Sequence, residues 1–478
     1  MELLFEKSIK NRRTDYLSKS DVPELTIPSK FVRTTAPILP ELSETDVTRH
    51  YTALESRTFG INDGFYPLGS CTMKYNPKIN DRVASMPGIA NIHPLAPVSS
   101  IQGMLEALND ANKSFAQITG MDLMSFQPAA GAHGELASLM MFKKYFETKG
   151  ETHRVEIIVP DSAHGTNPAT VSMCGMKVIN VKSNENGCID VEELKKVITP
   201  NLAGLMMTNP NTLGIFEENI IEITKIIHDN GGLCYYDGAN LNAIAGVIRP
   251  GDMGFDCIHL NLHKTFSTPH GGGGPGSGAI GCKSFLSEHL PGPQIIQKED
   301  GTYDFKAYDT SIGQILAFYG NTGISLRALA FVMSYGKEGI PLMAKHAVLN
   351  ANYLKHRLAS TFDIFNQGLC MHEFIVSMAK EKEYGFTAKT MAKAILDEGM
   401  MAPTMYFPLI VPEALMIEPT ETEGKEMLDH VADTYIRIYE EVSNDHSLAE
   451  QFPRTTIVKR PDEVLAARKP VLRWEEGL

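Results

Sequence analysis

A lysine follows a segment of alternating polarity near the middle of the chain. Between residues 257 and 263 polar and apolar residues alternate, and the polar members are Cys257, His259, Asn261 and His263. A β-strand has a period of two, and the polar face of a buried strand needs hydrogen-bonding partners or a ligand. Lys264 comes next, shortly before four consecutive glycines at 271–274. Partial desolvation lowers the pKa of a lysine and frees its amine for covalent chemistry with a carbonyl group.

A carboxylate ends the preceding predicted strand. The run GLCYYD finishes at Asp237, and ligands of open α/β sheets bind at the carboxyl ends of strands, where both Asp237 and Lys264 fall. Pyridoxal phosphate (PLP) needs a carboxylate against its pyridine nitrogen, because the protonated ring accepts electrons from a carbanion. Each residue alone has a plainer interpretation, since most lysines are solvated and an aspartate after a strand often caps a helix. The combination favours a PLP site.

Two further segments have properties that such a cofactor needs. The run PAAGAHGE at 128–135 opens a predicted helix with small residues, whose free backbone N–H groups suit a phosphate. It lacks the spacing of a nucleotide-binding P-loop, as does the glycine-rich run after Lys264. His164 follows the predicted strand VEIIVP, where an imidazole can stack on a flat ring. A hydrogen-bonded structural histidine is the alternative for His164.

Histidine spacing also raises the question of a metal. His259 and His263 are four residues apart, and His270 follows closely. This spacing suits one metal ion on a helix, but the segment alternates like a strand and has no carboxylate between the histidines. We therefore expect no metal site.

Composition limits the class of protein. The chain has 478 residues, a net charge of −13, 43% hydrophobic and 21% charged residues, which is ordinary for a globular enzyme. The negative charge argues against a nucleic-acid or anionic-membrane surface, and no apolar run approaches the roughly 20 residues that span a bilayer. Seven cysteines without a C-x-x-C spacing indicate neither a disulfide framework nor a zinc site. With no secretory signal at the N-terminus, we expect a reduced, cytoplasmic protein.

The order of predicted elements indicates an α/β protein with a mainly parallel sheet. Short apolar runs read as buried parallel strands: VEIIVP, MKVINV, LAGLMMT, GLCYYD, FDCIHLNL and GAIGC. Helical patterns separate several of them, and another covers 102–119. Ser43 is the expected N-cap of an earlier helix. We predict an irregular N-terminal segment (1–100), a large domain (101–325) and a smaller C-terminal α/β domain (326–478).

Longer strings around these residues resemble a known family. NLHKTF, PHGGGGPG and YYDGANLNAI are similar to the PLP site of the glycine-cleavage P-protein, glycine dehydrogenase (decarboxylating). So are YPLGSCTMKYNP, NIHP, SAHGTNPA, HEF, APTMYFP and IEPTE. The resemblance covers residues 66–420. The chain has about half the length of the family's single-chain form and looks like its lysine-bearing half, which is subunit 2 in two-subunit versions.

The resemblance implies a type I PLP-dependent fold, similar to that of aspartate aminotransferase. Lys264 would bind the cofactor covalently, Asp237 would contact the pyridine nitrogen and His164 would stack on the ring. The remaining expected cofactor-binding residues are Ala130, Gly131, Ala132, His263, Thr208 and Asn209.

The resemblance also implies a reaction and partners. Glycine would lose CO2, and its aminomethyl group would pass to the lipoyl arm of the H-protein, with a related subunit 1 completing a hetero-oligomer. Three alternatives stay open from the residues: another type I PLP decarboxylase or lyase, a non-catalytic scaffold subunit, and a phosphate- or nucleotide-binding module built on the glycine loop. We expect Cys71 to be a small packed residue rather than a redox-sensitive one.

Overall fold

The computed structural model describes residues 2–12, 18–93, 95–271 and 276–474. The chain divides into two units, one formed by Gly64–Thr456 and the other by Met1–Asp63 together with Ile457–Leu478. The predicted domain boundaries near residues 100 and 325 stay predictions. Three of the four glycines of the predicted loop, at 272–274, lie outside the described residues.

The smaller unit contains two α-helices among its described residues, α1 (Glu44–Glu55) and α12 (Glu463–Arg468), and a short 3-10 helix at Ser29–Phe31. The predicted N-cap Ser43 is confirmed, because its hydroxyl accepts a hydrogen bond from the Asp46 N–H at 3.1 Å. The Asp46 carboxylate accepts in return from the Ser43 N–H, which completes a capping box. The rings of Phe5 and Trp474 stack at 4.8 Å and join the two segments of this unit.

The larger unit is built on a seven-stranded sheet of order β1-β7-β6-β5-β4-β2-β3. Its strands are β1 (Leu123–Ser125), β2 (Glu156–Pro160), β3 (Lys177–Val181), β4 (Leu202–Thr208), β5 (Leu233–Gly238), β6 (Cys257–Asn261) and β7 (Gly278–Cys282). Strands β3, β2, β4, β5 and β6 are parallel neighbours, so the carboxyl ends of β4, β5 and β6 meet at one edge. The positions of the six predicted strands and the mainly parallel sheet are confirmed, but β3 (MKVINV) is an edge strand in which only Val181 is buried, not the buried strand that was predicted. The prediction was wrong for GAIGC, because β7 runs antiparallel to β6.

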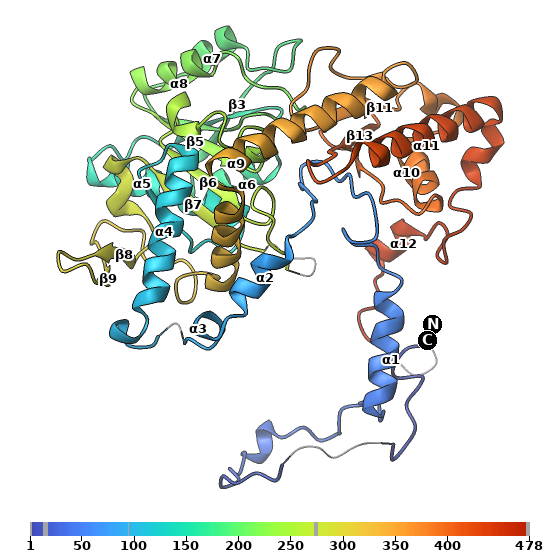
Figure 1. The fold of residues 1–478 in the computed structure, drawn as a ribbon, viewed down its shortest axis with the longest axis horizontal. Coiled ribbons are helices and arrows are strands. Elements are labelled where there is room, and N and C mark those ends of the chain that lie inside the picture. The colour runs from blue at the N-terminus through green and yellow to red at the C-terminus, as the bar shows by residue number, and fades with distance from the viewer. Residues whose placement is uncertain (1, 13–17, 94, 272–275, 475–478) are drawn as a thin grey trace. The chain divides into compact units, whose positions relative to one another are not determined.

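Helices cover both faces of this sheet (Figure 1). Along β5, Tyr235 packs in one core with α5 (Gly131–Thr148) and α6 (Thr166–Met173), while Tyr236 packs in another with α4 (Gln102–Thr119) and α8 (Ile220–Asp229). Successive side chains of a strand point to opposite faces, so each strand contributes to both cores. Asp237, the residue after Tyr236, therefore shares the face of Tyr235 and α5.

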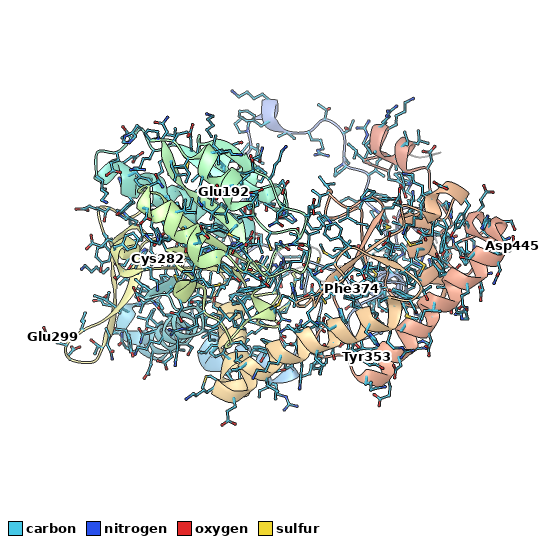
Figure 2. All side chains as sticks on the ribbon, turned by 90° about the horizontal axis from the view of Figure 1, so that it is seen from above. Glu192, Cys282, Glu299, Tyr353, Phe374 and Asp445 are labelled. Carbon is cyan, nitrogen blue, oxygen red and sulfur yellow. The ribbon has the colours of Figure 1, made fainter. Side chains whose placement is uncertain are left out.

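A second, antiparallel sheet lies in the later part of the larger unit. Its order is β10-β11-β13-β12, from β10 (Asp363–Ile364), β11 (Phe374–Ser377), β12 (Thr404–Met405) and β13 (Ala414–Ile417). Helices α10 (Ala388–Asp397) and α11 (Lys425–Asn444) pack with it in a separate core. Figure 2 shows Phe374 in this part, Cys282 of β7 in the large sheet and Tyr353 on the long helix α9 (Thr322–Leu358).

The remaining elements complete the larger unit. They are α2 (Lys78–Ala84), α3 (Pro87–Ala90), α7 (Val191–Val197) and the hairpin β8 (Gln294–Gln297) with β9 (Tyr303–Lys306). Helix α9 is interrupted at Gly336, whose φ of 64° lies in the left-handed region. No helix among the described residues combines the length and the apolar character required to cross a membrane.

The close contact between β4 and β5 gives a test of the sheet. A Cβ added at Gly204 would lie 2.2 Å from the carbonyl oxygen of Leu233, an atom of the paired backbone. Gly204→Ala should therefore lower the free energy of unfolding by about 1–3 kcal/mol, as overpacking does in a tight interior. Gly103→Ala is the control, because Gly103 is exposed on α4 with no atom within 4 Å of the added carbon. Denaturant unfolding measures the change in the free energy of unfolding. An equal change for both variants would contradict the register in which β4 pairs with β5.

Candidate active site

A cavity of about 130 Å³ opens at the carboxyl ends of β4, β5 and β6. The predicted residues that line it are Gly131, Ala132, His164, Thr208, Asp237 and Lys264. Strand ends supply Thr208 and Asp237, the start of α5 supplies Gly131 and Ala132, and Lys264 follows β6. The parallel sheet thus gathers residues that lie up to 133 positions apart in the chain (264 − 131).

Three predicted residues are not among those that line this cavity in the described chain. Ala130 is the N-cap of α5, and its carbonyl accepts from the Gly134 N–H at 3.0 Å. Asn209 turns its amide oxygen to the Glu217 N–H at 2.9 Å. His263 directs Nδ1 to the Ser277 carbonyl at 3.0 Å, because β6 ends at Asn261 and the strand alternation no longer applies.

Asp237 is buried, and its carboxylate is held by neutral donors. Asn167 donates its side-chain N–H to Oδ2 at 3.0 Å, and the Ala239 N–H donates to Oδ1 at 3.0 Å. His259, which pairs with Asp237 across β5 and β6, places Nε2 3.5 Å from Oδ1. Burial alone would raise the pKa of Asp237, but His259, these hydrogen bonds and Lys264 outweigh it and lower the pKa below its usual value. The carboxylate is therefore ionised at neutral pH.

His259 is itself fixed in place. Its Nδ1 hydrogen-bonds the Tyr235 hydroxyl, and its Nε2 lies 2.9 Å from Oδ1 of Asn261. These contacts engage both ring nitrogens and hold His259 beside the carboxylate of Asp237. The polar face predicted for β6 therefore contributes a partner to Asp237. The expectation that His259, His263 and His270 hold no metal stays a prediction. Burial, then His270 and Lys264, lowers the pKa of His263 to about 3, which keeps its imidazole neutral.

Glu135 is a buried lining residue that the sequence analysis did not single out. Its two carboxylate oxygens accept from the hydroxyls of Thr166 at 2.8 Å and Thr170 at 3.1 Å. The Thr166 N–H donates to Nδ1 of His164 at 3.2 Å, and the Thr166 hydroxyl lies 3.0 Å from the same nitrogen. Glu135 thus holds Thr166, which contacts His164. Burial, followed by the nearby Asp237, raises the pKa of Glu135. The sequence feature that could have indicated Glu135 is its position about one turn after the predicted helix start, as the last residue of PAAGAHGE.

The start of α5 approaches β6 closely. A Cβ on Gly131 would lie 2.3 Å from Nδ2 of Asn261 and 2.9 Å from Nε2 of His259. Only glycine permits this approach, and no side chain caps the N-terminus of α5. Gly131 and Ala132, at the positive end of the helix dipole, line the cavity, and an uncapped helix start of this kind suits an anion.

A second buried group lies beside the cavity. His372 and Glu373 precede β11, Glu418 follows β13, and Nε2 of His372 is 3.9 Å from a carboxylate oxygen of each glutamate. The Ser70 N–H, from a residue that lines the cavity, donates to Oε2 of Glu373 at 2.8 Å.

The predicted packing of Cys71 is supported by its partial burial, which raises the pKa of its thiol.

Neither glutamate of this group is an ordinary carboxylate. Burial, followed by the charge of Glu418, raises the pKa of Glu373 well above its usual value. Burial also raises the pKa of Glu418 to about 7, against the opposing effects of Thr72 and Lys264. Two close carboxylates in a low-dielectric site do not both ionise readily, so the pair retains a proton near neutral pH.

Solved structures define the class of the fold. A glycine decarboxylase (P-protein) of the glycine cleavage system in inhibitor-bound form superposes with a TM-score of 0.72 at 16% identity, over 86% of this chain and 93% of that one. A C-DES variant with glycine covalently linked to its PLP cofactor gives a TM-score of 0.61 at 11% identity, over 78% and 96%. The predicted type I PLP-dependent fold is confirmed.

Sequence comparisons define the family. The family model of the glycine cleavage system P-protein matches residues 7–310, and that of the glycine dehydrogenase C-terminal domain matches residues 343–461. A relative from Listeria monocytogenes, "Probable glycine dehydrogenase (decarboxylating) subunit 2", is 52% identical over 481 residues, covering 100% of this chain and 98% of the relative. The chain belongs to the glycine cleavage system P-protein family, and the resemblance inferred from the sequence is confirmed.

The raised pKa of Glu418 predicts how stability depends on pH. The folded carboxyl binds a proton up to about pH 7, whereas the unfolded one releases it near the ordinary 4.5. The folded state thus binds more protons between these values, and this contribution falls as pH rises through the interval. Glu418→Gln removes it, so the free energy of unfolding of the variant relative to the wild type should rise by about 1–3 kcal/mol between pH 5 and pH 7.5.

Denaturant unfolding at several pH values measures this difference. The groups that face Glu418 remain in the variant: His372, Glu373, Thr72, Lys264 and Glu421. Because Glu418 also raises the pKa of Glu373, the difference reports the proton that the pair shares. Glu383→Gln, at an exposed glutamate, is the control and should show no such slope. If the difference in free energy of unfolding between wild type and Glu418→Gln did not change with pH, Glu373 and Glu418 would not share a proton.

Proposed function

We propose that this chain is the PLP-bearing component of a glycine-decarboxylating enzyme, with Lys264 as the lysine that holds the cofactor covalently. The observation that carries the proposal is the single cavity that Lys264 and the ionised carboxylate of Asp237 share at neighbouring strand ends. A surface lysine would have no such partner, and a scaffold subunit would have no need to retain both groups.

The residues present fit the cofactor. The uncapped start of α5, with Gly131 where a Cβ would collide with β6, supplies N–H groups for a phosphate. Asp237 supplies a carboxylate for a protonated pyridine nitrogen, and His164 lies at the exposed side of the cavity, where its ring can cover the cofactor. When bound, PLP supplies an electron sink for the carbanion left by loss of CO2.

The protein's own residues have defined tasks. Asp237 keeps its negative charge through Asn167, Ala239 and His259, and so holds a proton at the ring nitrogen. The Thr166 N–H donates to Nδ1 of His164 and orients its imidazole ring, and Glu135 holds the Thr166 hydroxyl. Lys264 provides the amine that binds the cofactor and that recovers it after each turnover. Such preorganised groups act mainly by orientation and electrostatics.

The finer assignments follow from the family. We propose glycine as the substrate, with the aminomethyl group passing to the lipoyl arm of an H-protein and CO2 as the released product. A related subunit 1 is the proposed partner in a hetero-oligomer, and the cytoplasm is the proposed location. The remaining predicted cofactor contacts stay proposals. Thr208 and Ala132 line the cavity, whereas Ala130, Asn209 and His263 would have to act from outside its lining.

Covalent trapping tests the role of Lys264. Borohydride reduction of the PLP-loaded chain should fix the cofactor to the peptide that contains Lys264, because reduction converts a carbon–nitrogen double bond into a stable amine. Peptide mapping by mass spectrometry identifies the labelled lysine. Lys264→Arg should lose more than nine-tenths of the label, whereas Lys283→Arg, at a lysine that bonds the Gly120 carbonyl, should keep it. A label on another lysine, or none, would refute the assignment.

The partner requirement has a separate test. With lipoylated H-protein present, this chain mixed with the related subunit should exchange the glycine carboxyl with bicarbonate at least tenfold faster than either alone, because type I sites usually lie at a subunit interface. Size-exclusion chromatography should show a mixed oligomer. Full exchange by this chain alone, as a monomer or homodimer, would defeat the partner hypothesis and leave the role of Lys264 intact.

A further inference from the structure

A short segment enters the cavity from outside the large sheet. Leu68 pairs with Ile417 of β13 in an isolated bridge, and Ser70 lines the cavity that contains Lys264. Ser70 has a φ of 65° and Thr72 a φ of 47°. Residues other than glycine rarely adopt this left-handed region, so the surrounding structure must hold the turn at 70–72 in place.

Two buried glutamates hold this turn. Glu373 accepts from the Ser70 N–H at 2.8 Å. Glu418 accepts from the Thr72 N–H at 2.9 Å and from its hydroxyl at 2.6 Å. Glu373 directly precedes β11, and Glu418 directly follows β13. Because these neighbouring strands are antiparallel, the two glutamates lie at the same end of the small sheet. Each bond therefore fixes a left-handed residue to the small sheet.

The buried group of His372, Glu373 and Glu418 contains polar atoms without a hydrogen-bond partner in the described chain. His372 is fully buried with neither ring nitrogen hydrogen-bonded, and Oε1 of Glu373 has no partner in the described chain. Unpaired buried polar atoms are costly, and they are retained where a site needs them. They belong to the same group of side chains that holds the turn with Ser70, because Nε2 of His372 lies 3.9 Å from both glutamates.

The hydroxyl groups of the cavity are not equivalent. The Thr166 hydroxyl donates to Glu135 at 2.8 Å, and the Thr212 hydroxyl donates to the Ser162 carbonyl at 2.6 Å. Among the described residues, the hydroxyls of Ser70 and Thr208 make no hydrogen bond within the chain. Thr208 pairs with Asp237 at the strand ends, on the side proposed for the cofactor ring. The Ser70 hydroxyl is therefore an unpaired donor of the described cavity lining, and it comes from a segment outside the large sheet.

The cavity also lacks the usual carboxylate ligand. No arginine is among its described lining residues, and Lys264 is the one lysine there. A tight ion pair would stabilise the substrate carboxylate in the ground state and oppose its loss as neutral CO2. A neutral hydroxyl orients the carboxylate with less of this penalty, because catalysis needs binding that favours the transition state.

We propose that Ser70 binds the substrate carboxylate through its hydroxyl, and that Glu373 and Glu418 are positioning residues that hold the Ser70 turn for this contact. The inference rests on the proposed function, because it assigns a ligand to the amino acid bound at Lys264. It adds a specificity residue from a segment of the chain that comes before the large sheet.

Comparison of glycine with methylamine isolates the carboxylate. Equilibrium dialysis of the PLP-loaded full chain, assembled with the related subunit, measures the Kd of each amine. Ser70→Ala and Ser70→Gly should weaken glycine binding about tenfold, in the range for a hydrogen bond to a charged group. Both should leave the Kd of methylamine within about twofold. Ser70→Gly relieves the left-handed strain and Ser70→Ala retains it, so equal losses assign the effect to the hydroxyl.

Variants of Glu373 test the positioning role. Gln keeps a neutral acceptor for the Ser70 N–H, so Glu373→Gln should bind glycine within about twofold of the wild type. Glu373→Ala removes the acceptor and should weaken glycine binding about as much as Ser70→Ala, and combining the two should cause no further loss. Glu381→Ala is the control, because this buried glutamate accepts from the Tyr439 hydroxyl and does not line the cavity. It should lower stability with no change in either Kd.

The outcomes separate this inference from the proposed function. If the wild-type chain, assembled with the related subunit, binds neither amine, the proposed function fails and the inference with it. If the wild type binds both and Ser70→Ala binds glycine normally, the assignment of Ser70 is overturned while the proposed function stands. Equal weakening of glycine and methylamine in Ser70→Ala would likewise overturn it, because the residue would then be structural.

Discussion

The arrangement of this site depends on keeping one buried carboxylate charged. Asp237 ends a central strand, where water cannot solvate it, and a charge without partners there would cost several kcal/mol. The chain compensates with an amide from Asn167, the N–H of Ala239 and the imidazole of His259. These partners come from α6, from the turn after β5 and from β6, so the sheet and its cover must form together to stabilise one charge.

A contrasting environment lies beside the same cavity. Glu373 and Glu418 are as buried as Asp237, but they face each other and retain a proton. Similar carboxyl groups thus differ in charge because of their neighbours, as paired acids in active sites commonly do. The charged one faces the site proposed for the cofactor nitrogen. The proton-bearing pair holds the left-handed turn at 70–72.

Local pattern was enough to predict the parts of the site that depend on single strands. The alternation of β6 and the position of Asp237 and Lys264 at strand ends follow from the period of a strand and the geometry of parallel sheets. The same rules failed where an element ended early: β6 stops at Asn261, so His263 leaves the polar face. The direction of β7 was also inaccessible, because a five-residue apolar run is alike in parallel and antiparallel strands.

Long-range packing determined the rest. Ser70 and Glu373 are 303 residues apart and Thr72 and Glu418 are 346 apart, and no periodicity links residues at such separations. The strings GSCTMK, HEF and IEPTE carried the family resemblance with no visible reason to belong together. The structure supplies the reason, since they meet in one buried hydrogen-bonded group.

The central claim is that Asp237 keeps the pyridine nitrogen of the cofactor protonated. Solid-state ¹⁵N spectra of the full chain, loaded with PLP labelled at that nitrogen, measure this protonation directly. The account predicts a protonated nitrogen in the wild type and an unprotonated one in Asp237→Asn at the same pH. A labelled nitrogen that is unprotonated in the wild type, or equally protonated in both proteins, would contradict it.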